Sequence, residues 1–197
     1  TVTIRRPADA VAHGIALVPE ARATQGIIPA HSVADNMVMS VIGRIAPRGL
    51  VDRARVKEIT GDMIARLSIK TASRDHAVST LSGGNQQKVV IGKWLATEPE
   101  ILILDEPTAG IDIGSKAEII RLVRELAQAG KGVIVISSEL SELLTACDRI
   151  LVMADGRGHQ MLDRSDLDDP AERDPEHALQ AAERRLQIEI QKALSIK

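Results

Sequence analysis

The sequence predicts an α/β fold with a parallel sheet and a helical subdomain, and two observations support this. Between Ile101 and Met153, short apolar runs of strand character alternate with longer segments whose apolar residues keep helical spacing. Between Ile28 and about Leu67, the pattern is helical. Because strands that alternate with helices are typical of a parallel sheet, we expect a sheet covered by helices on both faces.

Length and composition exclude several classes of protein. At 197 residues, the chain is long enough for one domain plus a small subdomain. No apolar run approaches the roughly 20 residues of a membrane-spanning helix, and no basic start leads into an apolar signal segment, so we expect a soluble chain that is not exported. The net charge is −2 with both signs interspersed, and Trp94 is the only aromatic residue, so we expect no nucleic-acid partner. Trp94 and the single cysteine, Cys147, suit buried packing positions.

The first half of the chain contains one predicted strand and several predicted helices. Residues 14–18 form a short apolar run that favours a strand. Ser32 and Asp52 each have the pattern of a helix N-cap. The helix after Asp52 has these apolar positions at helical spacing: Val56, Ile59, Met63, Ile64 and Leu67. Another helix is expected from the glycine pair 83–84 to just before Pro99.

The second half follows an alternating pattern and ends in a helix. The predicted strands are 101–104, 133–136 and 150–153, and the predicted helices between them are 115–129 and 139–146. Asp155-Gly156 is a turn signal, so residues 158–163 are expected to return as an edge strand. The final helix, from about Glu176, is expected to pack on the body or on a partner. Its apolar residues are Leu179, Ala182, Leu186, Ile190 and Leu194.

Residues 81–88, Leu-Ser-Gly-Gly-Asn-Gln-Gln-Lys, predict a phosphate site. Two glycines after a serine, at the start of a helix, expose bare backbone N–H groups at the end where the helix dipole favours an anion.

Residues 101–108, Ile-Leu-Ile-Leu-Asp-Glu-Pro-Thr, predict a buried strand that ends in two carboxylates. Four apolar residues in a row are typical of a strand buried on both faces, and proline blocks continuation as a helix. Ionised groups at such a position need a cation or a proton-transfer role, so Asp105 and Glu106 are candidates for chemistry. A helix-capping role for this acid pair fits poorly with the apolar run before it.

Together these two motifs resemble the signature and Walker B motifs of the ATP-binding cassette (ABC) ATPases. The ending Asn-Gln-Gln-Lys is similar to the second nucleotide-binding half of monosaccharide importers whose ATPase carries two cassettes in one polypeptide. Four more blocks resemble the family in its order: 14–20, 32–37, 110–114 and 136–140. The resemblance implies a partial P-loop NTPase fold with a helical subdomain.

The resemblance also implies the roles of single residues. Asp105 holds Mg²⁺ through its water shell, and Glu106 orients and deprotonates the attacking water. Because cassettes dimerise head to tail, Ser82, Gly83 and Gly84 serve the γ-phosphate of ATP bound by another cassette. The same family pattern adds Gln86 to the nucleotide-binding residues and places Asp112 at the dimer interface.

Two positions depart from the family pattern. Glu20 stands where the family usually has a glutamine that touches Mg²⁺ and water. Ser138 stands where the family usually has the switch histidine, and a hydroxyl cannot become a cation near the γ-phosphate. Both changes resemble those of the second half of the sugar-importer ATPases, so we expect the site of this half to be slow or silent. Ser138 can also serve as the N-cap of the helix from Glu139.

The Walker A pattern of Gly, four residues, Gly-Lys and Ser or Thr does not occur in the 197 residues. We therefore expect the distal part of one cassette, beginning after the P-loop and inactive alone. Residues 1–28 are expected to start the core, 29–95 to form the helical subdomain with the signature, 96–165 to form the core with Walker B, and 166–197 to form a polar linker and the C-terminal helix. Nothing similar to the family is expected beyond about residue 165.

The expected function is that of an ATP-binding and hydrolysing subunit of a sugar importer, with ATP and Mg²⁺ as cofactors. The expected partners are another cassette, a transmembrane sugar permease and, indirectly, a periplasmic sugar-binding protein, at the cytoplasmic face of the membrane. The alternatives are an ABC ATPase that acts on ribosomes or DNA and a catalytically silent regulatory cassette. The long coiled coil or basic surface of the first alternative is not visible.

Overall fold

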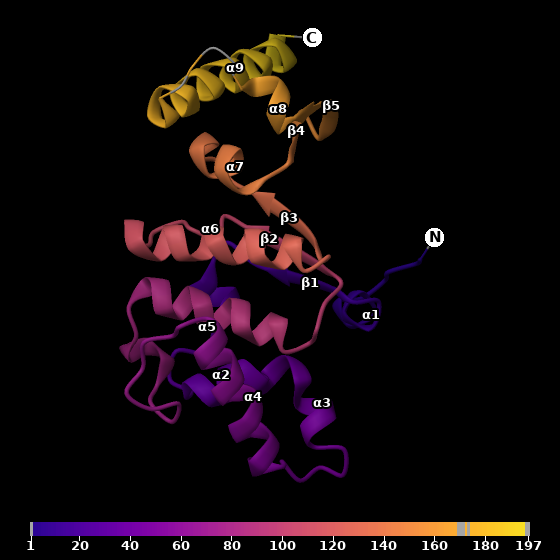
Figure 1. The fold of residues 1–197 in the computed structure, drawn as a ribbon. Helices are drawn as coiled ribbons and strands as arrows, with labels where there is room; N and C mark the ends of the chain where they lie inside the picture. The colour runs from indigo at the N-terminus through magenta and orange to yellow at the C-terminus, as the bar shows by residue number, and fades with distance from the viewer. Residues whose placement is uncertain (1, 169–171, 173, 196–197) are drawn as a thin grey trace. The chain divides into compact units, whose positions relative to one another are not determined.

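The computed structural model describes residues 2–168, 172 and 174–195, and it forms two compact units that divide between Ile136 and Ser137 (Figure 1). Among the described residues, no helix combines the length and apolar character needed to cross a membrane. The predicted domain limits at residues 28, 95 and 165 stay a prediction.

A three-stranded parallel sheet forms the centre of the first unit. Its strands are β1 (Ile15–Val18), β2 (Ile101–Asp105) and β3 (Gly132–Ile136), with β2 in the middle. The register pairs Leu17 with Ile103 and Ile103 with Ile134. The three strands confirm the ranges predicted from the sequence. Their parallel order brings the ends of β1 and β2, which precede Glu20 and Glu106, to the same edge of the sheet.

Only one face of this sheet is well covered. Helix α5 (Gly83–Leu95) contacts β1, and helix α6 (Ile113–Gln128) contacts β3. Alternate strand residues such as Val18 and Leu104 are buried, whereas Leu17 is 48% and Ile134 51% exposed. The expectations of a sheet covered on both faces and of a fully buried 101–104 strand are therefore wrong for the described residues, because only one set of alternating side chains lies beneath helices.

Three helices form a further layer beside α5 (Figure 1). They are α2 (Val33–Val38), α3 (Ile42–Ile45) and α4 (Arg53–Arg66), with a 3₁₀ turn at Met39–Val41. Ser32 accepts a hydrogen bond from the Asp35 N–H at 3.0 Å, and Asp52 accepts from the first turn of α4, so both predicted N-caps are confirmed. Their shared core consists of Ala34, Val38, Val41, Ile45, Val56 and Ala96.

Three short elements of the first unit were not predictable from periodicity. Helix α1 (Pro7–Ala12) has Pro7 at its start and reciprocal bonds between Arg6 and Asp9, but it buries no residue. A π-helical turn spans Arg22–Gly26, and a 3₁₀ turn spans Val78–Thr80. Segments this short present no repeating apolar pattern.

The second unit consists of α7 (Leu140–Ala146), β4 (Arg149–Ala154), β5 (Arg157–Asp163), α8 (Arg164–Leu167) and α9 (Pro175–Ser195). Strands β4 and β5 form a separate antiparallel pair. The expectation that 150–153 joins the parallel sheet is therefore wrong. The turn explains the pairing, because Asp155 and Gly156 have φ of 50° and 72°, the geometry of a two-residue hairpin that makes β5 the neighbour of β4.

Helix α9 packs within the second unit, against α7, α8 and β4. Ala182 and Leu186 are fully buried, but Leu194 is 61% exposed and Ala193 is buried in its place. This packing confirms the expected position of the helix on the body, and contact with a partner stays a prediction. Cys147 contacts the same apolar cluster. In the polar linker predicted at the start of 166–197, residues 169–171 and 173 lie outside the described residues.

Candidate nucleotide site

The start of α5 presents three backbone N–H groups with no acceptor among the described residues. Ser82 is the N-cap, but its hydroxyl accepts from the Asn85 side-chain amide at 2.9 Å instead of capping the helix. The first backbone bond of the helix runs from the Gln86 N–H to the Ser82 carbonyl at 2.9 Å. The N–H groups from Gly83 to Asn85 are therefore available, and together with the helix dipole they suit an anion.

Gly84 allows the starts of α5 and α6 to approach closely. A Cβ atom at this glycine would lie 2.1 Å from Ser115 Oγ and 2.5 Å from Ser115 Cβ. It would also lie 3.4 Å from Asp112 Oδ2. The structure thus brings Gly84 of the signature and Asp112 close together, and their shared role at a dimer interface stays a prediction.

Asp112 is the N-cap of α6. It accepts hydrogen bonds from the Ser115 N–H at 3.0 Å and from the Ser115 hydroxyl at 2.8 Å. These bonds, the backbone one first, hold the pKa of the Asp112 carboxyl below its ordinary value. Asp112 therefore stays ionised and orders the start of α6.

The chain changes direction sharply after β2. Asp105 is the last strand residue and pairs with Ile136, and the Glu106 N–H still donates to the Ile136 carbonyl at 2.9 Å. Glu106 has φ of 43°, in the left-handed region that residues with a side chain rarely adopt. The Ala109 N–H then donates to the Glu106 carbonyl at 3.1 Å and closes a turn. A strained, non-glycine residue held this way is a frequent feature of active sites.

The carboxylates at the end of β2 suit a metal ion that keeps most of its water ligands better than a metal ion coordinated only by protein side chains. The half-buried Asp105 carboxylate has no hydrogen-bond or ion-pair partner among the described residues. No group of three or more His, Cys, Asp or Glu in the described part of the chain is arranged to hold a metal ion. Mg²⁺ commonly binds through one or two carboxylates, substrate phosphates and water, so the donor set at Asp105 fits Mg²⁺ only together with a phosphate ligand.

The remaining predicted residues differ in how they relate to this edge. Glu20 follows β1 and its exposed carboxylate has no partner among the described residues, whereas the Gln86 side chain turns back and donates to the Leu81 carbonyl at 3.0 Å. Ser138 belongs to the second unit, and its place at the switch position near the γ-phosphate stays a prediction.

Ser138 is not the N-cap residue of the following helix. Helix α7 begins one residue later than expected, with Glu139 as its N-cap, and the Ser137 hydroxyl bonds to the backbone at this end. Ser137 accepts from the Glu139 N–H at 3.1 Å and donates to Glu142 at 2.9 Å. The capping expectation is wrong because the hydroxyl one residue earlier meets the backbone N–H.

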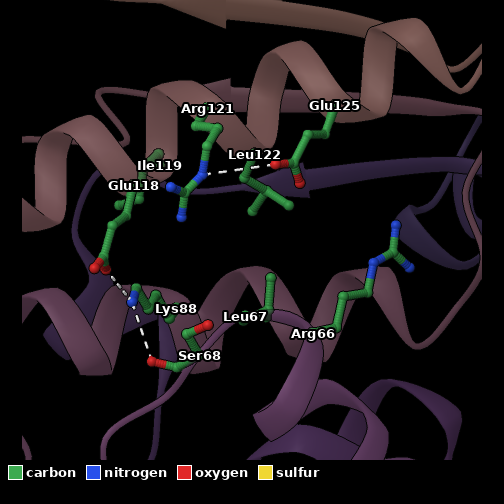
Figure 2. A pocket seen from close by; sticks show the side chains of 9 residues that line it. All are labelled: Arg66, Leu67, Ser68, Lys88, Glu118, Ile119, Arg121, Leu122 and Glu125. Carbon is green, nitrogen blue, oxygen red and sulfur yellow. Dashed lines mark hydrogen bonds and ion pairs between the residues drawn. The ribbon is translucent and has the colours of Figure 1, made fainter.

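One turn after the start of α5, a partly buried ion pair between Lys88 and Glu118 links α5 to α6 (Figure 2). The Lys88 ammonium, on a side chain only 6% exposed, donates to Glu118 and to the Ser68 carbonyl. The hydrogen bond from Lys88 lowers the pKa of the Glu118 carboxyl. The cavity beside this pair has a volume of about 30 Å³, enough for roughly one water molecule.

A second cavity, of about 180 Å³, opens between Arg66, Leu102 and Lys131. None of the residues predicted to bind nucleotide lines either cavity. The candidate site is therefore the open edge where the starts of α5 and α6 meet the loop after β2.

The described residues thus contain a parallel sheet, a glycine-rich helix start that suits an anion and a carboxylate pair at the end of the central strand, and these features are typical of α/β domains of the P-loop class. The comparison with protein families is more specific, because residues 3–109 match the model described as "ABC transporter". The chain belongs to this family.

Sequence relatives include named import proteins. The chain is 46% identical over 182 residues to the ribose import ATP-binding protein RbsA of Rhodopirellula baltica, a match that covers 92% of the chain and 34% of that protein. It is 49% identical over 155 residues to the xylose import ATP-binding protein XylG of Burkholderia cenocepacia, covering 79% of the chain and 30% of that protein. The chain thus spans about a third of the length of these curated relatives. The match to RbsA covers 182 of the 197 residues, so it extends past residue 165. The expectation that similarity ends near residue 165 is therefore wrong.

Solved structures support the fold. An ATP-binding cassette solved as a dimer in a post-hydrolysis state with ADP and Pi has a TM-score of 0.66 at 21% identity, over 82% of this chain and 68% of that one. The cbiO1 protein of Clostridium perfringens has a TM-score of 0.66 at 22% identity, over 92% of this chain and 66% of that one. At this identity, the likeness shows the ABC ATPase fold alone.

Proposed function

We propose that this chain is the distal part of the second nucleotide-binding cassette of a monosaccharide importer and contributes to ATP binding and hydrolysis. The proposal rests on one observation: the backbone N–H groups from Gly83 to Asn85 have no acceptor among the described residues, and they lie close to Asp112 at the start of α6. The names of the ribose and xylose relatives support the sugar importer as its context.

The signature would act on a nucleotide held by another cassette. The Ser82 hydroxyl is exposed, and the N–H groups of Gly83 and Gly84 have no acceptor among the described residues, so these donors at a helix start suit the γ-phosphate of ATP at a dimer interface. Gln86 contributes less than the glycines in this proposal, because its amide is engaged by Leu81. Asp112 would lie at the same interface.

The edge after β2 would serve the nucleotide of this cassette. Asp105 would hold Mg²⁺ through water, and Glu106 would orient and deprotonate the attacking water. Mg²⁺, when bound, supplies charge neutralisation at the β- and γ-phosphates. Glu20 and Ser138 lack the chemistry of the glutamine and histidine that the family pattern has at these positions. We therefore propose that this cassette hydrolyses its own ATP slowly.

A mutant pair in the complete two-cassette protein tests the proposal. Ser82→Arg should reduce steady-state ATPase activity by about a hundredfold, because it blocks donors to a transferring phosphate. Glu106→Gln should reduce it much less. Ser165→Arg introduces the same residue at an exposed serine of α8 and serves as the control. Equal losses for Ser82→Arg and Glu106→Gln would show that this half's own site is catalytic, and full activity of Ser82→Arg would refute the role of the signature.

The proposed partners are a transmembrane sugar permease, which docks near residues 22–41, and a periplasmic sugar-binding protein that acts through it. The assembly would lie at the cytoplasmic face of the membrane. Cross-linking from a cysteine at the exposed Ile28 tests the docking surface, in a background where Cys147 is replaced by serine. Gly26 is unsuitable as a labelling site, because it is buried and its Cβ would lie 2.9 Å from Val90. Met153→Cys, exposed in the second unit, is the control, and cross-links from Ile28 only to another cassette would refute this surface.

A further inference from the structure

The Arg22 side chain joins three parts of the candidate site that are far apart in the sequence. It follows Glu20 by two residues, and its Nη1 donates to the Ala109 carbonyl at 2.9 Å while its Nη2 donates to the Gly110 carbonyl at 3.3 Å. Both carbonyls belong to the loop between Glu106 and Asp112. A half-buried guanidinium therefore spans from the end of β1 to the loop after β2.

The same guanidinium lies against the start of the signature helix. A Cβ at Gly83 would come within 2.9 Å of Arg22 Nη2. The bare backbone of Gly83 thus has a local packing reason in addition to its proposed role toward phosphate. Within the described residues, this arginine has no carboxylate partner, so its two neutral carbonyl acceptors define its geometry without neutralising its charge.

The other end of the Arg22–Gly26 turn is also attached to α5. The Gly26 carbonyl accepts a hydrogen bond from the buried Lys93 ammonium, and Gly26 lies against Val90. The turn is therefore fixed at its first residue to the loop after β2 and at its last residue to the signature helix.

We propose that Arg22 is a positioning residue that holds the Glu20 segment, the start of α5 and the 106–112 loop in one arrangement. Two parallel donors to consecutive carbonyls require a planar guanidinium, which a lysine cannot replace. Movement of the segment proposed to meet the permease is then transmitted to the signature and to Asp112. This inference rests on the proposed function, and it adds a residue to which neither the motifs nor the comparisons assign a role.

The test compares Arg22→Ala and Arg22→Lys with Arg53→Ala in the complete two-cassette ATPase. Arg53 is an exposed arginine on α4 with no partner among the described residues, so its loss removes the same charge without a contact. Arg22→Ala should lower kcat roughly tenfold with the KM for ATP within about twofold, because the interactions lost are charge-assisted bonds that order the site and do not bind the nucleotide. Arg22→Lys should recover little of the loss, and Arg53→Ala should match the parent protein.

Hydrogen exchange of the peptide that covers residues 106–112 supplies a readout independent of turnover. It should be faster in both Arg22 variants and unchanged in Arg53→Ala. A parent protein without ATPase activity would refute the proposed function, while the exchange result would still decide whether Arg22 orders the loop. Unchanged exchange, or full kcat in Arg22→Lys, would overturn the positioning role. If Arg22→Ala does not fold, Arg22→Lys alone decides the outcome through the same two measurements.

Discussion

A single added methyl group at Gly84 tests the close approach on which the candidate site depends. In Gly84→Ala, the new Cβ would lie 2.1 Å from Ser115 Oγ and 2.5 Å from Ser115 Cβ, well inside contact distance. The first of these atoms can rotate away, but the second is attached directly to the backbone of α6. The two helices therefore have to separate.

The expected cost follows from two opposing effects. Overpacking of this kind costs about 1–3 kcal/mol. Replacing glycine by alanine in a helix contributes up to about 1 kcal/mol of stabilisation, and less in the first turn. We expect a net loss of about 1–2 kcal/mol in the free energy of unfolding of the first unit.

Gly61 provides a matched control, because it lies inside α4 and its added Cβ would have no atom within 4 Å apart from its chain neighbours and the nearby backbone of its own helix. Gly61→Ala should stabilise the same unit by about 0.5–1 kcal/mol. Urea denaturation followed by Trp94 fluorescence reports both changes, since Trp94 is the only aromatic residue and lies on α5. If Gly84→Ala is as stable as Gly61→Ala, the starts of α5 and α6 do not approach as described.

A double-mutant cycle locates the clash. Ser115→Gly removes the two atoms at 2.1 Å and 2.5 Å from the new methyl group, at the cost of the Ser115 hydroxyl bond to Asp112. In the Ser115→Gly background, Gly84→Ala should lose about 1 kcal/mol less than in the parent protein. Additive losses would place the strain elsewhere.

Three further predictions concern charged groups. Burial lowers the pKa of the Lys93 ammonium from its ordinary value of 10.5, so between the lowered pKa and pH 10.5 the unfolded chain binds a proton that the folded protein has released. The free energy of unfolding should therefore rise with pH in this window. In urea titrations, Lys93→Met should remove this rise, and the exposed control Lys57→Met should keep it. Glu118→Gln should destabilise the first unit by about 1 kcal/mol at neutral pH, a small value because the Glu118 side chain is 37% exposed to solvent. This loss should vanish as pH falls through the lowered pKa of Glu118. A loss that persists below that pKa in urea denaturation would contradict the ion pair with Lys88. Asp112→Asn keeps a hydrogen-bond acceptor for the start of α6 but removes the charge. The Asp112 carboxylate contributes stability above its ordinary pKa of 3.8, and this contribution is lost as pH falls through the lowered pKa, so that part of the acid denaturation curve should be absent from Asp112→Asn. An unchanged curve would argue against capping by the ionised carboxylate.

The parts of the structure that the sequence predicts are those with a local physical cause. Ser32 and Asp52 cap helices because their side chains meet N–H groups two or three residues away. The strands at β1, β2 and β3 follow from short apolar runs between turn residues. For the same reason, the glycine pair at the start of α5 and the carboxylate pair at the end of β2 can be proposed as candidates for chemistry from the sequence.

The parts that the sequence does not predict depend on contacts between distant segments. Arg22 is one charged residue in a polar turn, and nothing local indicates that its guanidinium reaches the Ala109 carbonyl. The single covered face of the sheet has the same origin, since an apolar run such as 101–104 does not say how many helices will lie on it. The pairing of β4 with β5 was indicated by Asp155-Gly156, but it competes with the strand alternation that suggests a continued parallel sheet.

Helix α5 shows how these two kinds of information meet in one element. Along its length, its side chains and glycines make contacts with the rest of the first unit: Gly83 with Arg22, Gly84 with Ser115, Lys88 with Glu118, and Lys93 with Gly26. Its sides are therefore occupied by packing, and the N–H groups of Gly83, Gly84 and Asn85 in its first turn have no acceptor among the described residues. A helix held on several sides can present those groups to a phosphate with little reorganisation, which is the condition under which positioned donors contribute most to phosphoryl transfer.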